Sequence, residues 1–281
     1  MNFQKHFFFA VAGMILLLTA TGLRAGDGTW NQVLPGLEHA EFNGNQENGP
    51  QEFEISILRI EPDYFQFKLL SASQNHNKQR TIKGWVRESG LLAGINAGMF
   101  WEDRLTSTGY MKNFEHFNNK IIHPDYGAFF VFNPLVGNID QVKLIDRNNT
   151  PDWKEQIQQY ATVVQNYRMI SSKRKNVWVN KSKRFSVAAI GQDKDDRVLF
   201  IFSKTPSSIH DLNNRLLELP IGIQTCMFVE GGPVASMYLN NKTMKMEWAG
   251  LNKTTFWSQV PGTMYQIPNV IGIVPSPDKP E

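Results

Sequence analysis

The sequence predicts an α+β protein with a mixed, largely antiparallel sheet, a few flanking helices and a single domain. Strand-like apolar runs outnumber helical patterns, and the two kinds do not alternate regularly as they would in a parallel α/β fold. No linker-like segment divides the 281 residues, of which 41% are hydrophobic. Such a chain can bury a sizeable core within one large domain.

Two strands open the predicted domain. Residues 53–60 alternate apolar and polar side chains, and residues 64–70 resume after a turn at 61–63 that contains Pro62. We expect these two strands to form a hairpin, because a short turn joins them. The next predicted elements are a short helix over 81–89 ended by Gly90, and buried strands over 91–95 and 127–132.

The second half of the domain mixes helices and strands. Apolar residues at helical spacing after Thr150-Pro151 predict a helix over 152–165. A second hairpin is predicted from strands 185–190 and 197–202, which flank a turn-rich segment. The remaining predicted elements are a helix over 207–219 with Ser208 and Asp211 at its start, a strand ending at 229 and a last strand over 267–274.

The N-terminus resembles a secretory signal. Lys5 and His6 precede an apolar run over 7–18, and small residues follow near Ala25. The run is shorter than the ~20 apolar residues that a membrane span needs, although an uncleaved anchor is the alternative. We therefore expect three parts: a signal peptide (1–25), an irregular lead-in (26–50) and the folded domain (51–281).

Cysteine usage and charge limit the compartment and the partners. Cys226 is the single cysteine, so no intramolecular disulfide can form, and export without disulfides favours a bacterial periplasm. We expect this thiol to be buried and to pack in the core rather than to act as a nucleophile. The net charge of +3 gives no reason to expect a nucleic-acid partner, and no stable membrane insertion is expected after signal cleavage. The basic residues within 173–184 are expected to form a solvated loop.

Two strand ends carry polar residues followed by glycine. The segment 93-AGINAGMF-100 ends a strand in Asn96 and Gly98, and 227-MFVEGGP-233 ends one in Glu230, Gly231 and Gly232. Glycine lets a ligand approach the backbone, so both ends can present a side chain to a substrate. The alternative is that both are tight turns whose polar side chains satisfy the backbone.

Three other residues are candidates for charge chemistry. Arg184 can hold a carboxylate or phosphate as a fixed fork, or it is a surface arginine in a basic loop. His123 and Asp125 are a possible acid/base pair, although a loop histidine is more often ordinary. The sequence contains no dinucleotide-binding, P-loop, zinc-protease or nucleophile-elbow motif, and its histidines lack metal-ligand spacing. No cofactor and no metal are predicted.

Several motifs occur together in a fixed order along residues 53–274. They are 95-INAGMF-100, Gly109, Gln165 in 163-VVQNYRMI-170, Arg184 with 186-SVAAIG-191, and 229-VEGGPVASMY-238. This ordered set resembles the phosphodiester glycosidase family, which includes the domain of the mannose 6-phosphate uncovering enzyme, and it is most similar to the family's bacterial periplasmic branch. Glu230 stands where the family more commonly has Asp, and Ala97 where many members have Gly.

The resemblance implies a hydrolase that cleaves a sugar-1-phosphodiester on a cell-envelope or capsular glycan. Under it Glu230 stabilises the cationic sugar or activates water, Arg184 binds the phosphate, and Asn96 positions the substrate. The alternative is a non-catalytic glycan-binding or envelope-assembly protein on the same fold. The residues expected to bind substrate are Gly98, Phe100, Gly109, Gln165, Gly231, Gly232 and Ser236.

Overall fold

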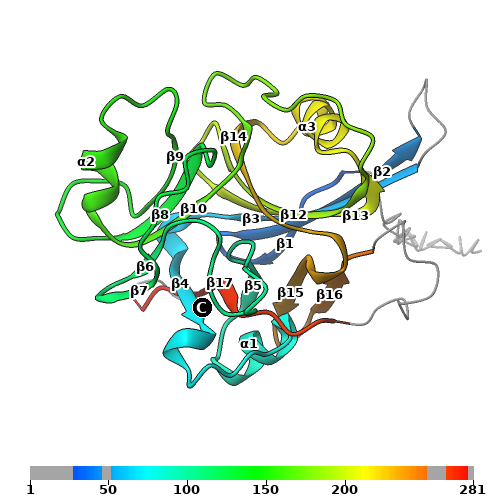
Figure 1. The fold of residues 1–281 in the computed structure, drawn as a ribbon. Coiled ribbons are helices and arrows are strands. Elements are labelled where there is room, and N and C mark those ends of the chain that lie inside the picture. Colours follow the sequence, from blue (N-terminus) through cyan, green and yellow to red (C-terminus); the bar gives the residue numbers. More distant parts are fainter. Residues whose placement is uncertain (1–27, 46–51, 252–263, 278–281) are drawn as a thin grey trace, which may run out of the picture.

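The computed structural model describes residues 28–45, 52–251 and 264–277, and strands dominate them (Figure 1). The strands form one seven-stranded and two five-stranded sheets. Every pairing between described strands is antiparallel, so the expected α+β class with a largely antiparallel sheet is confirmed in its coarse form, with no parallel pair among them. The predicted signal peptide lies outside the described residues.

The largest sheet begins in the segment that was expected to be irregular. Residues 31–45 form two strands that continue the sheet beyond β3, so the prediction of an irregular lead-in is wrong there. Its polar composition hid the pattern, because alternate residues face solvent at this edge. In spatial order the strands are β1 (Asn31–Leu34), β2 (Leu37–Asn45), β3 (Glu52–Ile60), β13 (Val198–Ser207), β12 (Phe185–Asp193), β14 (Ile223–Gly231) and β11 (Arg168–Ile170).

The predicted hairpin between residues 53–60 and 64–70 is wrong, although both strands exist. β3 is paired on both sides, by β2 and β13, and therefore has no free edge for β4. The 3-10 turn η1 (Pro62–Tyr64) instead directs β4 (Phe65–Ser71) into another sheet, where it pairs with β17. Strand content was readable from alternation, but the partner was not.

The second sheet corrects the helix that was predicted over 152–165. Only α2 (Trp153–Gln158) is helical, and β10 (Tyr160–Asn166) follows it. The run 160–164 is fully buried, and its β-branched residues suit a strand that is paired on both sides. The spatial order is β7 (His116–Asn119), β6 (Met111–Asn113), β10, β8 (Ala128–Pro134) and β9 (Val142–Asp146).

The third sheet is covered by the first helix. α1 (Ile82–Glu88) starts at Thr81, whose side chain accepts a hydrogen bond from the Gly84 amide, and it ends before Gly90 as predicted. Figure 1 shows α1 beside β15 and β5, away from α2 and α3. The spatial order is β16 (Lys245–Ala249), β15 (Ser236–Asn240), β5 (Ala93–Asn96), β17 (Asn269–Pro275) and β4.

The main core lies between the faces of the sheets. Buried side chains from β4, β5, β8, β13, β14 and β17 share one cluster, which holds Phe67, Phe130 and Phe200. A second cluster covers the other face of the largest sheet, where α3 (Ile209–Glu218) packs. Ser208 caps this helix by accepting from the Asp211 amide, which confirms the predicted start. The other short elements are the 3-10 turns η2 (Ala72–Gln74) and η3 (Gly232–Val234).

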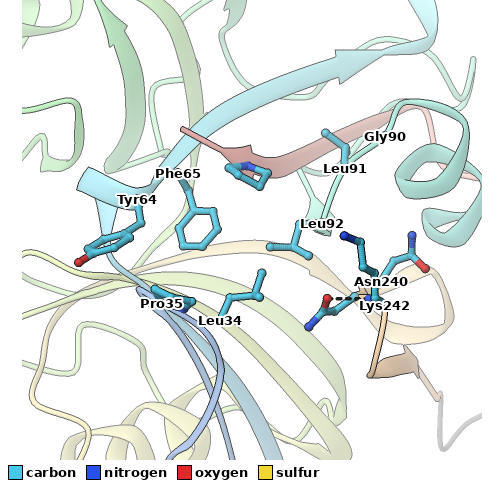
Figure 2. A pocket seen from close by; sticks show the side chains of 11 residues that line it. Leu34, Pro35, Tyr64, Phe65, Gly90, Leu91, Leu92, Asn240 and Lys242 are labelled. Atoms are coloured by element: carbon cyan, nitrogen blue, oxygen red, sulfur yellow. Dashed lines mark hydrogen bonds between the residues drawn. The ribbon is translucent and has the colours of Figure 1, made fainter. Parts of the chain in front are cut away.

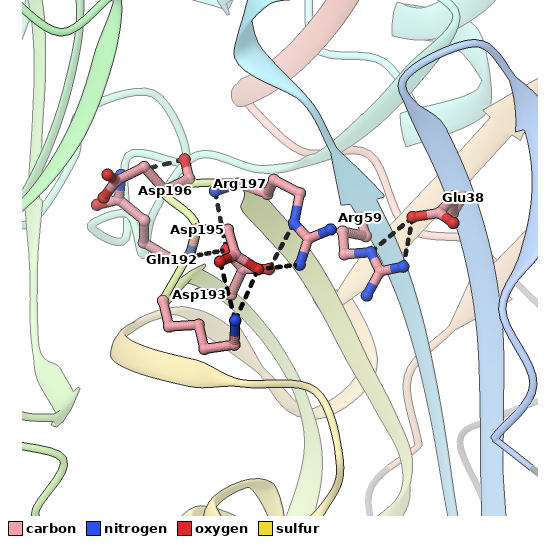
Figure 3. Close-up of polar contacts among 8 residues, drawn as sticks. Glu38, Arg59, Gln192, Asp193, Asp195, Asp196 and Arg197 are labelled. Atoms are coloured by element: carbon pink, nitrogen blue, oxygen red, sulfur yellow. Dashed lines mark hydrogen bonds and ion pairs between the residues drawn. The ribbon is translucent and has the colours of Figure 1, made fainter.

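The predicted hairpin of residues 185–202 is confirmed, and an ion-pair network holds its turn (Figure 3). Asp193 is 1% exposed and accepts hydrogen bonds from the amides of Asp195 and Arg197, at 3.0 and 2.9 Å. The Arg197 side chain donates to the same carboxylate at 2.8 Å. The buried charge is therefore balanced by a cation and two backbone donors.

Candidate active site

Three strand ends from the three sheets converge, and each carries a polar side chain. Asn96 ends β5, Asn166 ends β10 and Glu230 lies near the end of β14. The Asn166 amide donates to the Val229 carbonyl at 3.3 Å, which ties the second sheet to the first. The Gly98 position lies 3.4 Å from the same amide nitrogen, measured from the site that a Cβ would occupy. These contacts bring the motif around Asn96 next to the motif around Glu230.

Asn96 holds the turn that follows the paired glycines. Its Oδ1 accepts from the Ser236 amide at 2.7 Å, and its Nδ2 donates to the Val234 carbonyl at 3.0 Å. The Ser236 hydroxyl lies 3.4 Å from the same Asn96 oxygen. The structure thus brings Asn96 and Ser236 together, and the Asn96 amide bonds to protein backbone at both of its ends.

Glu230 is the buried carboxylate of the site. It is 6% exposed, and its one described hydrogen bond comes from the Gly231 amide at 2.9 Å. Burial raises the pKa of Glu230 to about 8, and the Gly231 amide offsets only part of that shift. Among the described residues no cation forms an ion pair with it. At neutral pH the carboxyl therefore holds a proton that it can exchange readily.

A β-bulge sets the direction of Glu230. Ala188 pairs with Glu230 while its neighbour Ala189 pairs with Phe228, so Val229 is the extra residue of β14. Ala188 belongs to the main core between the sheets, whereas Ala189 belongs to the cluster under α3. The bulge thus places Glu230 opposite Ala188, next to the converging strand ends, rather than under the helix.

Tyr126 is a buried phenol whose electrostatic surroundings include Glu230. Burial raises its pKa, and the charges of Tyr167 and Glu230 add to that shift. The Tyr126 hydroxyl donates to Thr108 Oγ1 at 2.9 Å, and its ring stacks on His123 at 3.9 Å between centroids. His123 Nδ1 accepts from the exposed Asp125 backbone amide. Both predicted acid/base residues therefore flank Tyr126.

Gln165 fastens the loop that carries Tyr126. Its Oε1 accepts from the amides of Tyr110 and His123, and its Nε2 donates to the carbonyls of His123 and Tyr126, all within 2.8–3.2 Å. The side chain is fully buried, so it supports the loop from inside. Gly109 lies against this strand, because a Cβ there would come within 2.3 Å of the Gln165 carbonyl oxygen. Close packing accounts for glycine at this position.

Gly231 and Gly232 are required for different structural reasons. A Cβ at Gly231 would approach the Phe185 ring to 2.6 Å. Gly232 has a φ of +71° and open space around it, so backbone conformation rather than packing demands glycine there. Both glycines let the chain turn directly after Glu230 into η3.

Two predicted site residues lie apart from this group. The Arg184 guanidinium pairs with Asp211 at the start of α3, at 3.2 Å, and its side chain is 42% exposed. No described contact joins it to Glu230 or Asn96. Phe100 packs against a hydrophobic cluster that includes Trp85 of α1 and Val270 of β17. The Arg104 guanidinium lies 5.9 Å from the Phe100 ring.

Sequence reasoning missed Tyr126 and Asn166 as site residues. Asn166 carries the same signal that identified Asn96, a polar side chain at the end of a buried strand, but the predicted helix over 152–165 concealed it. Tyr126 follows His123 and Asp125 directly, and no local pattern separates it from an ordinary loop tyrosine. Its role depends on contacts with residues distant in sequence.

A separate pocket of about 290 Å³ lies at the opposite ends of β5 and β15, lined by Leu34, Phe65 and Leu92 (Figure 2). It is therefore not part of the Glu230 site. Over residues 28–45, 52–251 and 264–277 we find no cluster of three or more acidic, histidine or cysteine side chains suited to a metal. Within the same ranges, none of the helices has the length and apolar character of a membrane span. Cys226 is buried, and burial raises the pKa of its thiol.

Comparisons with known proteins identify the family and the fold. The phosphodiester glycosidase (NAGPA) family profile matches residues 89–274. The catalytic domain of zebrafish N-acetylglucosamine-1-phosphodiester alpha-N-acetylglucosaminidase, auto-inhibited by its pro-peptide, superimposes with a TM-score of 0.61 at 11% identity, over 89% of this chain and 86% of that one.

A hypothetical protein from Synechocystis superimposes with a TM-score of 0.58 at 14% identity, over 85% of this chain and 62% of that one. At these identities the two structures show a shared fold. No curated protein sequence matches the chain significantly. The profile match covers well over half of the sequence, and it includes the ends of β5, β10 and β14 that build the site. The chain therefore belongs to the phosphodiester glycosidase family.

Proposed function

We propose that this protein is an exported hydrolase that cleaves a sugar-1-phosphodiester of a cell-envelope or capsular glycan. Family membership supports the reaction type, and the zebrafish relative is named for cleavage of the same kind of bond. The signal-like N-terminus and the single cysteine support a periplasmic location.

The proposed reaction is hydrolysis at the anomeric carbon of the sugar. Water attacks the anomeric carbon, the bond from that carbon to the phosphate oxygen breaks, and the phosphate monoester leaves with the electron pair. Such a leaving group needs little protonation, so the site has mainly to stabilise the cationic sugar and to accept a proton from the water. Ionised Glu230 can serve either role. Arg184 would have to leave Asp211 to reach the phosphate.

The observation that carries the proposal is the environment of Glu230. A buried carboxyl without a cationic partner among the described residues costs stability, and a structural role would be better served by Gln. Its pKa of about 8 is instead well placed for proton transfer near neutral pH. Asn166, which contacts the neighbouring Val229 carbonyl, and Tyr126, which interacts electrostatically with Glu230, are nearby polar groups that can bind sugar and phosphate oxygens.

The test is hydrolysis of a panel of sugar-1-phosphodiesters and nucleotide sugars by the purified chain, measured as release of reducing sugar. We expect Glu230→Gln to lower kcat by about 10³-fold. The matched control is Glu155→Gln on the exposed face of α2, which should retain full activity. Full activity in Glu230→Gln would remove Glu230 from the mechanism. Glycan binding without any turnover by the unmodified chain would favour the non-catalytic alternative.

A further inference from the structure

A second pocket, of about 280 Å³, lies beside the candidate site. Its lining combines aromatic, apolar, cationic and polar side chains: Asp125, Gly127, Asn148, Tyr167, Arg168, Val177, Trp178, Val179 and Lys181. Tyr167 stands between this pocket and the site, because its ring lies 4.3 Å from the ring of Tyr126. The pocket and the Glu230 site are therefore linked through the contact between these two tyrosines.

The aromatic pair of the pocket is fixed in place. The Trp178 ring lies 5.5 Å from Tyr167 in an edge-to-face arrangement, and its indole nitrogen donates to the Arg168 carbonyl at 2.7 Å. Both rings are only half-buried. Rigid, partly exposed aromatic rings beside polar groups are suited to a sugar ring, which has an apolar face and a polar edge.

The lining carries two cations, Arg168 and Lys181, and one carboxylate, Asp125, whereas the adjoining segment 171–184 is strongly basic and favours an anion. Residues 171–184 contain six basic side chains and no acidic one: Lys173, Arg174, Lys175, Lys181, Lys183 and Arg184. Arg168 is neutralised by the buried carboxylate of Asp146, at 2.6 Å, so it adds little net charge. Lys181 is exposed and is the pocket's other cation. A negatively charged group on the ligand would meet it without displacing an internal ion pair.

We propose that this Tyr167–Trp178 pocket binds a neighbouring unit of an anionic glycan chain whose phosphodiester is cleaved at Glu230. This inference rests on the proposed function and specifies its substrate: a polymer with repeated negative charges, rather than a small phosphodiester. The sugar of the neighbouring unit packs against Tyr167 and Trp178, and its anionic group pairs with Lys181. The basic segment 171–184 attracts the rest of the chain.

The experiment compares two substrates that share one scissile bond. One is the methyl phosphodiester of N-acetylglucosamine-1-phosphate, and the other is a trisaccharide joined by two such phosphodiester bonds. We expect the unmodified chain to show about tenfold lower KM for the trisaccharide. Lys181→Glu should remove that advantage without changing KM for the methyl ester, and 0.5 M salt should reduce it. Trp178→Phe, which keeps an aromatic ring for folding, should remove part of it.

The matched control is Lys245→Glu on β16, which makes the same charge change at an exposed lysine far along the chain. Equal KM values for the two substrates in the unmodified chain, or an equal effect of both glutamate variants, would overturn the inference while leaving the hydrolase intact. If the chain hydrolyses neither substrate, calorimetry with the trisaccharide still decides. Binding that Lys181→Glu abolishes would support the pocket, and absence of binding would refute it.

Discussion

The two ends of the β12–β14 strand pair each bury a carboxylate, but they treat it in opposite ways. At one end, Asp193 receives two backbone amides and the Arg197 side chain. At the other end, Glu230 has a single described hydrogen bond and no ion-pair partner among the described residues. Asp193 is 1% and Glu230 is 6% exposed, so burial does not separate them.

This difference in partners distinguishes a carboxylate that stabilises the fold from one that is suited to proton transfer. A buried charge with matched partners, such as Asp193, holds a turn in place. A buried acid without a cation is held near neutrality, where it can gain or lose a proton at moderate cost. The same pair of strands thus provides a rigid hairpin at one end and a titratable group at the other.

The pH dependence of activity is the largest expected effect. If ionised Glu230 is the reactive form, kcat/KM should rise about tenfold per pH unit and level off above the pKa of about 8. The change between pH 6 and pH 8 is then roughly fiftyfold, because half of the carboxyl is ionised at its pKa. Initial rates in a constant-ionic-strength buffer series measure it. A rate that falls over the same range would assign the reaction to the protonated acid instead.

Removing the paired carboxylate should cost stability and leave the chemistry alone. Asp193→Ala strands Arg197 and two backbone amides, and we expect it to lower the free energy of unfolding by about 3 kcal/mol. Urea unfolding measures the loss. The control is Asp195→Ala in the same turn, where the side chain is 47% exposed and the expected cost is much smaller. A similar loss of unfolding free energy in both variants would contradict the stabilising role of the buried Asp193 carboxylate.

Glu230→Gln should have the opposite effect on stability. The folded pKa is raised above its unfolded value, so ionisation disfavours the fold as pH rises from about 4.5 to about 8. The variant should match the unmodified chain below that window and exceed it above the window by on the order of 5 kcal/mol. Thermal or urea unfolding from pH 4 to pH 9 tests this. A variant that is less stable at pH 9 would show that the carboxylate is stabilised by partners.

Local signals in the sequence were enough for several elements of the fold. The turn between strands 185–190 and 197–202, and the cap at Ser208, both act within a few residues and were read correctly. Long-range pairing was not readable, since nothing near residue 60 indicates that β3 pairs with β13 while β4 pairs with β17. Helical spacing over 152–165 was misleading because both faces of β10 are buried.

The candidate site could be predicted only in part, because local patterns in the sequence are readable and long-range contacts are not. Asn96 and Glu230 were found because a polar residue followed by glycine at a strand end is a local pattern, and the structure brings their two motifs together. Tyr126 acquires its place through Gln165 and Thr108, which are distant in sequence or unremarkable in type. The guanidinium of Arg184 pairs with Asp211, a contact that only the tertiary fold creates.

One buried glutamine lies near each end of the β12–β14 pair, and replacing them is expected to give the smallest change in activity. Gln165 fastens the loop of Tyr126 near Glu230, whereas Gln192 links β12 to Leu144 and Asp196 near the Asp193 end. Replacing either with Glu keeps the shape but removes the donor, so both variants should lose stability. Only Gln165→Glu should disturb Tyr126, and we expect its kcat to fall about tenfold with KM little changed.

Steady-state kinetics and urea unfolding on both glutamine variants separate positioning from general stability. Because a merely structural role would lower folded fraction without altering the pH profile of the remaining enzyme, the profile of Gln165→Glu is the sharper readout. We expect its midpoint to move away from that of the unmodified chain, since the new carboxylate at position 165 adds a negative charge to the loop of Tyr126, which interacts electrostatically with Glu230. Equal kcat losses in the Gln165 and Gln192 variants would mean that the two ends of the strand pair are coupled through stability alone.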